Sequence, residues 1–479
     1  TGATLFTNLD RPTLNRARFD ARLAIDPGTI VKLEGSHIQT DIGAQFIAEG
    51  REGHPVVFTS RLDDRFGGSG TFDTNNDDGD DDNEDTPAPG NWGGIFIGHI
   101  GRASIDHALI TFAGGINRIE GDFAGFNAIE VHQAEVRITN RVIEHNGSGF
   151  GGSAPSFRFG RGFHAPATIF VRDSQPIIVD NIIRGNGGAS DGTQVAAINV
   201  GVNSLNYRLV KDYGRSVGKI DLITRYRDNQ GPMVRGNQLA NNEVNGMTVR
   251  GGVLTSQSIF DDTDIVHVVF DEILVTDFHT YGGLRLESSP TESLVVKLSG
   301  ASAGLTATGR PLDIDDRIGG AVHIIGQPGF PVVLTSLSDD SVGAGFAPNG
   351  LPQTDTNNRG GSPSPGDWRS IKLDQFGSDR NIDVIVEREP ADITAPGINA
   401  TPDVGQQIGI IAPFEKSGDE NLRLGVEIHG FLAAPADVDV YSFLADGGTE
   451  VWLDIDRSTT ALDTVIELID STGVVIARS

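Results

Sequence analysis

Short apolar runs, separated by glycine and polar turn residues, recur along most of the chain. Examples are the runs at residues 29–33, 44–48 and 56–58. Almost no segment places apolar residues at the 3.6-residue spacing of an amphipathic helix. The runs are rich in Val, Ile and Thr, which favour strands, and the 62 glycines allow tight turns between them. The pattern predicts an all-β protein.

A long internal repeat is the clearest feature of the sequence. Residues 42–64 and 318–340 are identical at 11 of 23 aligned positions, at a constant offset (318 − 42 = 276). The same register returns at Trp92 and Trp368, so the repeat extends over 42–95 and 318–371. Self-similarity over short β-type segments is typical of a repetitive scaffold.

A finer repeat lies in the middle of the chain, where two β-type runs alternate with asparagine turns. Its copies are residues 134–147, 174–187 and 231–242. Asparagine tolerates the left-handed turn conformation, and its side-chain amide can hydrogen-bond along a stack of equivalent turns. Asparagines recur at matching places in these copies, namely Asn146, Asn186 and Asn242, and again Asn181 and Asn237.

These copies predict a parallel β-helix (solenoid), in which each strand stacks on its equivalent in the next rung and inward Ile and Val form a continuous core. The variable spacing between copies predicts long loop insertions, at Ser148–Pro166 and Ala189–Asn229. An array of β-sandwiches is the alternative, but it would not place asparagine in register between the runs.

The domain organisation follows from where this pattern begins and ends. We expect an N-terminal cap or lead-in at 1–23, the solenoid at 24–386, and a proline-containing linker at 387–421. Alternating apolar residues then predict a small C-terminal β-sandwich at 422–479. The chain stops directly after a strong strand, so we expect that module to be partial.

Charge and composition limit the possible partners. The chain carries 37 basic and 65 acidic residues, a net charge of −28. This negative field repels nucleic acid and anionic membrane surfaces. There is no cysteine, hence no disulfide or thiolate metal site, and no apolar run approaches the roughly 20 residues of a membrane-spanning helix. We therefore expect neither nucleic-acid binding nor membrane insertion.

Two groups of acidic residues are candidate calcium ligands, because Ca²⁺ takes carboxylate and carbonyl oxygens. The first is a loop whose carboxylates and amide alternate around Gly79, although the glycine comes one position late for an EF-hand. The alternative for this loop is a solvated acidic surface. Its candidate ligands are Asp73, Asn75, Asp77, Asp78, Asp80 and Asp82.

The second group lies in the C-terminal module, where alternating strand residues share one face. Asp437, Asp439, Asp454 and Asp456 could form a calcium site there, or a solvated strand face.

Catalysis is not expected. Adjacent acidic pairs occur at 63–64, 261–262, 315–316 and 339–340, but two of these are copies of each other, which favours a structural turn. Neither the Gly-His-Gly nor the Arg-Ile-Lys companion of polygalacturonase-type sites is present, and no histidine pair has metal-site spacing.

Two stretches resemble known families. The first consists of Pro-Val-Val-Phe-Thr-Ser at 55–60, followed by Pro-Gly-Asn-Trp at 89–92 and similar motifs through residue 386. It resembles right-handed β-helix segments of very large bacterial (planctomycete-like) surface proteins. Residues 437–443, 453–456 and 462–465 resemble the bacterial pre-peptidase C-terminal domain. The first resemblance implies the handedness of the solenoid. The second implies export, not catalysis.

Together these features predict a non-catalytic β-helical scaffold of an extracellular, secreted or cell-surface protein with a structural or adhesive role. Stabilisation by calcium and the formation of filaments are further hypotheses. The protein's expected partners are other copies of itself or a cell-surface or matrix polysaccharide. The alternative is a secreted β-helix protein that binds or cleaves polysaccharide.

Overall fold

The structure is a computed structural model of the 479-residue chain, and it divides into two compact units. Unit 1 comprises residues 1–275, 282–306 and 322–372, and unit 2 comprises 276–281, 307–321 and 373–479. The structure describes residues 21–75, 86–152, 158–187, 194–206, 230–277, 283–309, 320–374, 382–389, 397–411, 425–432, 436–449 and 464–478, with a few single positions and short stretches between them.

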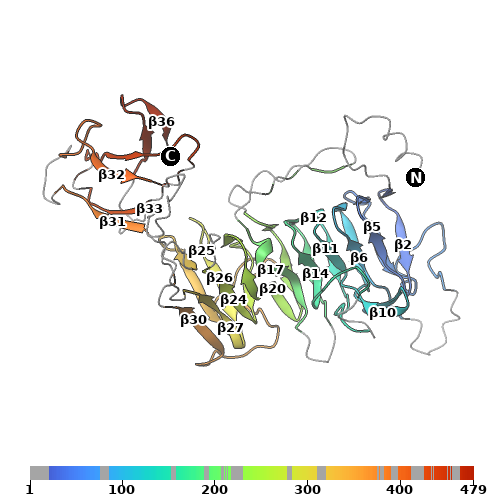
Figure 1. The fold of residues 1–479 in the computed structure, drawn as a ribbon. Helices are drawn as coiled ribbons and strands as arrows, with labels where there is room; N and C mark the ends of the chain where they lie inside the picture. Colours follow the sequence, from blue (N-terminus) through green and yellow to red (C-terminus); the bar gives the residue numbers. More distant parts are fainter. Residues whose placement is uncertain are drawn as a thin grey trace, which may run out of the picture. The chain divides into compact units, whose positions relative to one another are not determined.

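Unit 1 is a parallel solenoid with three strands in each rung, which confirms the predicted fold class (Figure 1). The first six rungs contribute in turn to three sheets. One sheet contains β1 (Arg22–Ile25), β4 (Gln45–Glu49), β7 (Arg102–Asp106), β12 (Glu135–Thr139), β15 (Ile177–Val179) and β18 (Met233–Arg235). The next contains β2 (Ile30–Leu33), β5 (Val56–Ser60), β8 (Ala108–Thr111), β13 (Val142–Glu144), β16 (Ile182–Arg184) and β19 (Gln238–Ala240).

The third sheet, called the long sheet below, continues through nine rungs. It contains β3 (Ile38–Thr40), β6 (Ile95–Ile97), β11 (Ile129–His132), β14 (Ala167–Arg172), β17 (Ala196–Gly201), β20 (Val244–Arg250), β23 (His267–Val269), β26 (Leu294–Leu298) and β29 (Val332–Ser336).

After the sixth rung the other two sides continue as separate sheets. One contains β21 (Gly252–Leu254), β24 (Glu272–Val275), β27 (Gly300–Ala307) and β30 (Trp368–Leu373), and the other β22 (Ser258–Phe260), β25 (Gly283–Glu287) and β28 (Ala321–Ile325). A hairpin of β9 (Ile116–Ile119) and β10 (Asp122–Gly125) and one 3-10 turn, η2 (Val202–Ser204), interrupt the rungs. No helix in the described part of the chain is long and apolar enough to cross a membrane.

In-register stacking produces the core. Along the long sheet, Ile129 pairs with Ile95 on one side and Ile169 on the other, and all three side chains are fully buried. Two residues further along each strand, a second buried apolar column follows the same register. Alternate residues point outward, so Phe96, Glu130 and Phe170 form an external column.

Asparagine ladders satisfy the polar turns on both sides of the second sheet, as the sequence predicted. Asn146 Nδ2 donates to Asn186 Oδ1 (2.9 Å), whose own Nδ2 donates to Asn242 Oδ1 (2.9 Å). A second ladder joins Asn181 Nδ2 to Asn237 Oδ1 (2.9 Å). All five amides are buried. The left-handed backbone conformation falls on the residue before each ladder position, for example φ 57° before Asn146 and 64° before Asn186, and not on the asparagine itself.

The long sequence repeat corresponds to one repeated structural unit. In the first copy, Thr59 Oγ1 donates to Asp63, and Ser60 Oγ donates to Asn91 Oδ1 (2.9 Å). In the second copy, 276 residues later, Thr335 Oγ1 donates to Asp339 (2.6 Å), and Ser336 Oγ donates to Asp367. These side chains close the base of the loop that leaves the second strand of each unit.

The two copies occupy different sides of the solenoid. The first copy places β5 next to β2 and β8 and its last strand, β6, on the long sheet. The second copy instead places β29, the counterpart of β5, on the long sheet. The repeat is therefore a strand–turn–strand–loop–strand unit that occurs in two different placements on the solenoid.

Unit 2 contains three two-stranded sheets. Parallel pairs join β31 (Ile382–Val386) to β33 (Gly425–His429) and β32 (Gln406–Ile410) to β34 (Tyr441–Leu444), and an antiparallel pair joins β35 (Glu467–Ile469) to β36 (Val475–Arg478). β32 falls within the segment that the sequence assigned to a linker.

The ladder makes Asn186 a stability determinant. Asn186→Ala would leave the Asn146 backbone and side-chain N–H groups without their shared acceptor and Ile143 O without its donor. Because unsatisfied buried polar groups each cost about 1–3 kcal/mol, we expect the variant to lose about 3 kcal/mol of unfolding free energy in urea denaturation. Asn349→Ala, in an exposed turn, is the matched control. Equal, small losses in both variants would contradict a structural ladder.

Candidate functional site

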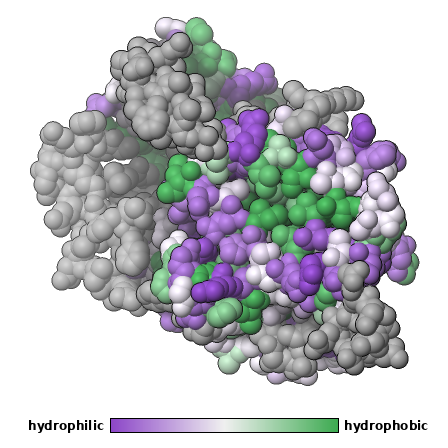
Figure 2. Space-filling view, turned by 90° about the vertical axis from the view of Figure 1, so that its right-hand side faces the viewer, coloured by the Kyte–Doolittle hydropathy of each residue, from purple (hydrophilic) through white to green (hydrophobic). Residues whose placement is uncertain are grey.

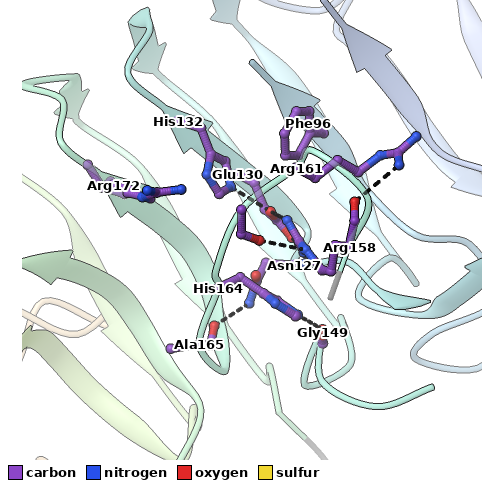
Figure 3. Close-up of polar contacts among 12 residues, drawn as sticks. Phe96, Asn127, Glu130, His132, Gly149, Arg158, Arg161, His164, Ala165 and Arg172 are labelled. Carbon is purple, nitrogen blue, oxygen red and sulfur yellow. Dashed lines mark hydrogen bonds and ion pairs between the residues drawn. The ribbon is translucent and has the colours of Figure 1, made fainter. Parts of the chain in front are cut away.

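A buried polar cluster lies on the outer face of the long sheet, beneath the 148–166 loop (Figure 3). Glu130 points outward from β11, and Arg158 of the loop reaches it with two hydrogen bonds (2.8 and 2.6 Å). Both side chains are fully inaccessible to solvent. The guanidinium also lies over the Phe96 and Phe126 rings, with centroid distances of 5.8 and 5.2 Å.

Histidines complete this cluster without adding charge. His132 Nε2 lies 2.8 Å from Glu130 Oε2, and His164 Nε2 lies 2.8 Å from the Gly149 carbonyl. Burial lowers the pKa of both imidazoles below 6.5, which favours their neutral forms. Burial opposes the ionisation of Glu130, but hydrogen bonds from Arg158 and His132 hold its pKa below the ordinary value of 4.5. The cluster therefore consists of the Glu130–Arg158 ion pair, whose two charges cancel, and two neutral histidines.

Further hydrogen bonds fasten the loop and the start of β14 that follows it. Asn127 Nδ2 donates to the carbonyls of Ala165 (2.8 Å) and Ala167 (2.9 Å). Arg161 Nη1 donates to Glu120 Oε2 (2.7 Å), and Arg161 Nε donates to Gln39 Oε1 (2.8 Å). Since these contacts come from separate rungs, the loop is fixed against the sheet on several sides.

The fastened loop forms one wall of a groove of about 400 Å³ on unit 1. Phe163, Ala165 and Pro166 line it from the loop side. Asn199, Thr248 and Arg250 line it from the long sheet, and Phe270 and Asp271 follow β23. The groove thus combines exposed aromatic surface with polar groups that converge from neighbouring strands.

Unit 2 contains a cluster of carboxylates. Glu389, just after β31, and Asp437 and Asp439, just before β34, each place one oxygen within 4.8 Å of the others. Within the described residues this is the group of acidic or histidine side chains that could hold a metal ion. Glu387 lies beside it and accepts hydrogen bonds from Asn399 Nδ2 (3.2 Å) and Tyr441 Oη (2.9 Å).

The chemistry of this acidic cluster suits a hard cation. Burial, followed by the hydrogen bond and charge of Glu387, raises the pKa of Asp439 to about 7. Three of the surrounding oxygens, Glu389 Oε1, Asp439 Oδ1 and Asn399 Oδ1, are buried without a hydrogen-bond partner. Buried oxygens that lack a donor are costly, and a bound cation would satisfy them.

The structure places the sequence-predicted ligands unevenly. It brings Asp437 and Asp439 together, as predicted, but with Glu389 as the third carboxylate. Asp454 and Asp456 lie outside the described residues, as do Asp77, Asp78, Asp80 and Asp82 of the acidic loop. Asp73 and Asn75 are described, and Asp73 joins no group of three ligand residues within the described part of the chain.

Sequence reasoning missed Glu389 and the Glu130–Arg158 pair. Glu389 lies in the segment that was assigned to a linker, although Glu387 and Glu389 alternate as residues 437 and 439 do. The Glu130–Arg158 pair joins positions 28 residues apart and has no signature in the sequence.

No known protein family, curated protein or solved structure matches the chain.

Glu130→Gln tests whether the buried ion pair holds the loop. The variant leaves Arg158 buried without a countercharge, and breaking a buried pair in this way costs about 3–5 kcal/mol. Because the folded-state pKa of Glu130 lies below 4.5, its contribution to stability is present above pH 4.5 and is lost as the pH falls further. We therefore expect the wild type to lose more stability than the variant between pH 5 and 3, measured by urea denaturation.

The double variant Glu130→Gln/Arg158→Met is the control, because it removes both charges. It should recover part of the lost stability at pH 7. An equal loss in the single and double variants would argue against a charge pair as the fastening.

Proposed function

We propose that the chain is a non-catalytic β-solenoid scaffold of an extracellular or cell-surface protein, with a structural or adhesive role. The observation that carries this proposal is that the recurring polar residues form hydrogen bonds within the scaffold. The repeated asparagines form ladders. Asp63 and Asp339, which belong to the acidic pairs weighed above as catalytic candidates, accept hydrogen bonds that close equivalent loops. Such residues support a rod of stacked rungs.

The resemblance to β-helix segments of large bacterial surface proteins supports this location, and the absence of cysteine is compatible with it. The acidic surface repels nucleic acid and anionic membranes over distances longer than the screening length. We propose a polysaccharide or further copies of the chain as the partners.

The end of the solenoid where β2 lies gives one reason to include self-association. Figure 2 shows this end with an apolar patch surrounded by polar residues. The first rung contributes Ile25, Val31, Leu33 and Ile38, which are only partly buried against the core. Among the described strands, β1, β2 and β3 each pair on one side only, and a strand at the edge of a sheet is a template for pairing with another chain.

We further propose that calcium binds the acidic cluster of unit 2. Ca²⁺ accepts six to eight oxygen ligands in flexible geometry, and Glu389, Asp437 and Asp439 bring carboxylate oxygens together. Calcium would neutralise the repulsion between these carboxylates.

Calcium should stabilise the protein in thermal unfolding. Relative to excess EGTA, we expect millimolar calcium to raise the midpoint of the transition that reports unit 2, since a ligand of the folded state stabilises it by mass action. The rise should be larger at pH 8 than at pH 6, because Asp439, with a pKa of about 7, must lose its proton to bind the cation.

Asp439→Asn and Glu389→Gln should each abolish most of this rise, while Asp403→Asn, at an exposed position in unit 2, should leave it intact. An undiminished shift in both cluster variants would place calcium elsewhere, and the acidic loop at 73–85 would then be the next site to mutate.

A further inference from the structure

The groove on the long sheet contains a cation without an anionic partner. Arg250 makes no ion pair with any residue that the structure describes. Its Nη2 donates to the Val171 carbonyl (2.7 Å), its Nη1 donates to Asn199, and the guanidinium lies 4.4 Å from the Phe170 ring centroid. The side chain is therefore held in one orientation by neutral groups.

The charge of Arg250 is poorly compensated. Burial lowers its pKa to about 10, Asp173 favours the charged form from a distance, and Arg172 opposes it. A ligand carboxylate in the groove would supply the missing countercharge.

The other lining groups favour a sugar ring over a flexible peptide. Phe163 is 57% exposed at the groove and packs edge-on against Phe170 (6.2 Å), so its free face is available to the C–H face of a pyranose. Thr248 is 94% buried, and its Oγ1 has no hydrogen-bond partner. That oxygen is inaccessible to solvent, so Thr248 offers the groove only the rest of its side chain, whereas the carboxylate of Asp271 can accept a hydrogen bond from a ligand hydroxyl.

The volume is consistent with this ligand. A groove of about 400 Å³ is at the small end of ligand sites and accommodates one or two sugar rings. The Glu130–Arg158 pair fixes the loop that carries Phe163, so the wall is formed before the ligand arrives.

We propose that this groove binds a uronate residue of an acidic polysaccharide, with its carboxylate at Arg250, its ring face on Phe163 and a hydroxyl at Asp271. This inference deepens the adhesive part of the proposed function by naming the chemical class of the partner. It does not depend on the calcium cluster of unit 2, so a negative result for sugar binding leaves the calcium proposal standing, and the reverse also holds.

Isothermal titration calorimetry with trigalacturonate tests the proposal at about 0.15 M salt, where the Debye length of about 8 Å screens the overall negative charge. The matched control ligand is the same trisaccharide with its carboxyl groups reduced to hydroxymethyl groups. We expect the acidic trisaccharide to bind and the reduced one to bind at least about tenfold more weakly.

Variants assign the binding to the groove. Phe163→Ala should weaken binding of trigalacturonate about five- to tenfold, whereas Phe159→Ala, an equally exposed phenylalanine of the same loop that does not line the groove, should leave it unchanged. Arg250→Met should abolish binding, and Arg250→Lys should restore only part of it because it lacks the planar fork. Thermal midpoints show whether the Arg250 variants remain folded.

Three results would overturn the proposal: no binding of trigalacturonate, equal binding of the reduced trisaccharide, or equal losses in Phe163→Ala and Phe159→Ala. Equally tight binding of a hexa-aspartate peptide would also overturn it, since the groove would then select carboxylates without a sugar ring.

Discussion

Each rung of the solenoid hydrogen-bonds to the next through its backbone, and every other feature must fit that stacking. A side chain that points inward meets its own counterparts from the rungs above and below. Where the counterparts are Ile and Val, they form the apolar core. Where they are polar, they must satisfy one another, because water cannot reach them. Asn146, Asn186 and Asn242 do so as donors and acceptors in series.

The same constraint extends to the outer face of the long sheet. Where a loop covers outward-pointing side chains of this sheet, polar side chains lose their contact with water. The loop then has to supply hydrogen-bonding or charged partners that offset the cost of burial. Arg158 neutralises Glu130 in this way, and the loop thereby becomes a rigid wall. Arg250 occupies the same face, but no described carboxylate pairs with it as Glu130 pairs with Arg158. The groove beside the loop therefore carries a positive charge.

The sequence predicts the features that repetition encodes. Two copies at a fixed offset, and asparagines in register, suffice to infer a parallel solenoid and its ladders. They also identify the 63–64 and 339–340 pairs as copies of one turn. The sequence does not reveal that the second copy is shifted onto a different side, because an in-register repeat is compatible with either placement.

Features that appear once in the chain are harder to predict. Glu389 joins Asp437 and Asp439 only because β31 and β34 bring separate segments together. Arg158 reaches Glu130 across an insertion of variable length. The left-handed positions before the ladder asparagines also escaped prediction, since His145, Gly185 and Asn241 share no residue type.

Hydrogen exchange followed by mass spectrometry tests the central claim, that buried asparagine ladders make the turns as well protected from local unfolding as the strands. Peptides covering 139–147 and 179–187, which hold β13 and β16 with the turns on both sides of each, should exchange as slowly over their whole length as those covering β14 and β17. Complete exchange of the turn peptides within seconds, beside protected strands, would contradict the account, because the asparagine turns would then be open loops and not part of the solenoid's interior.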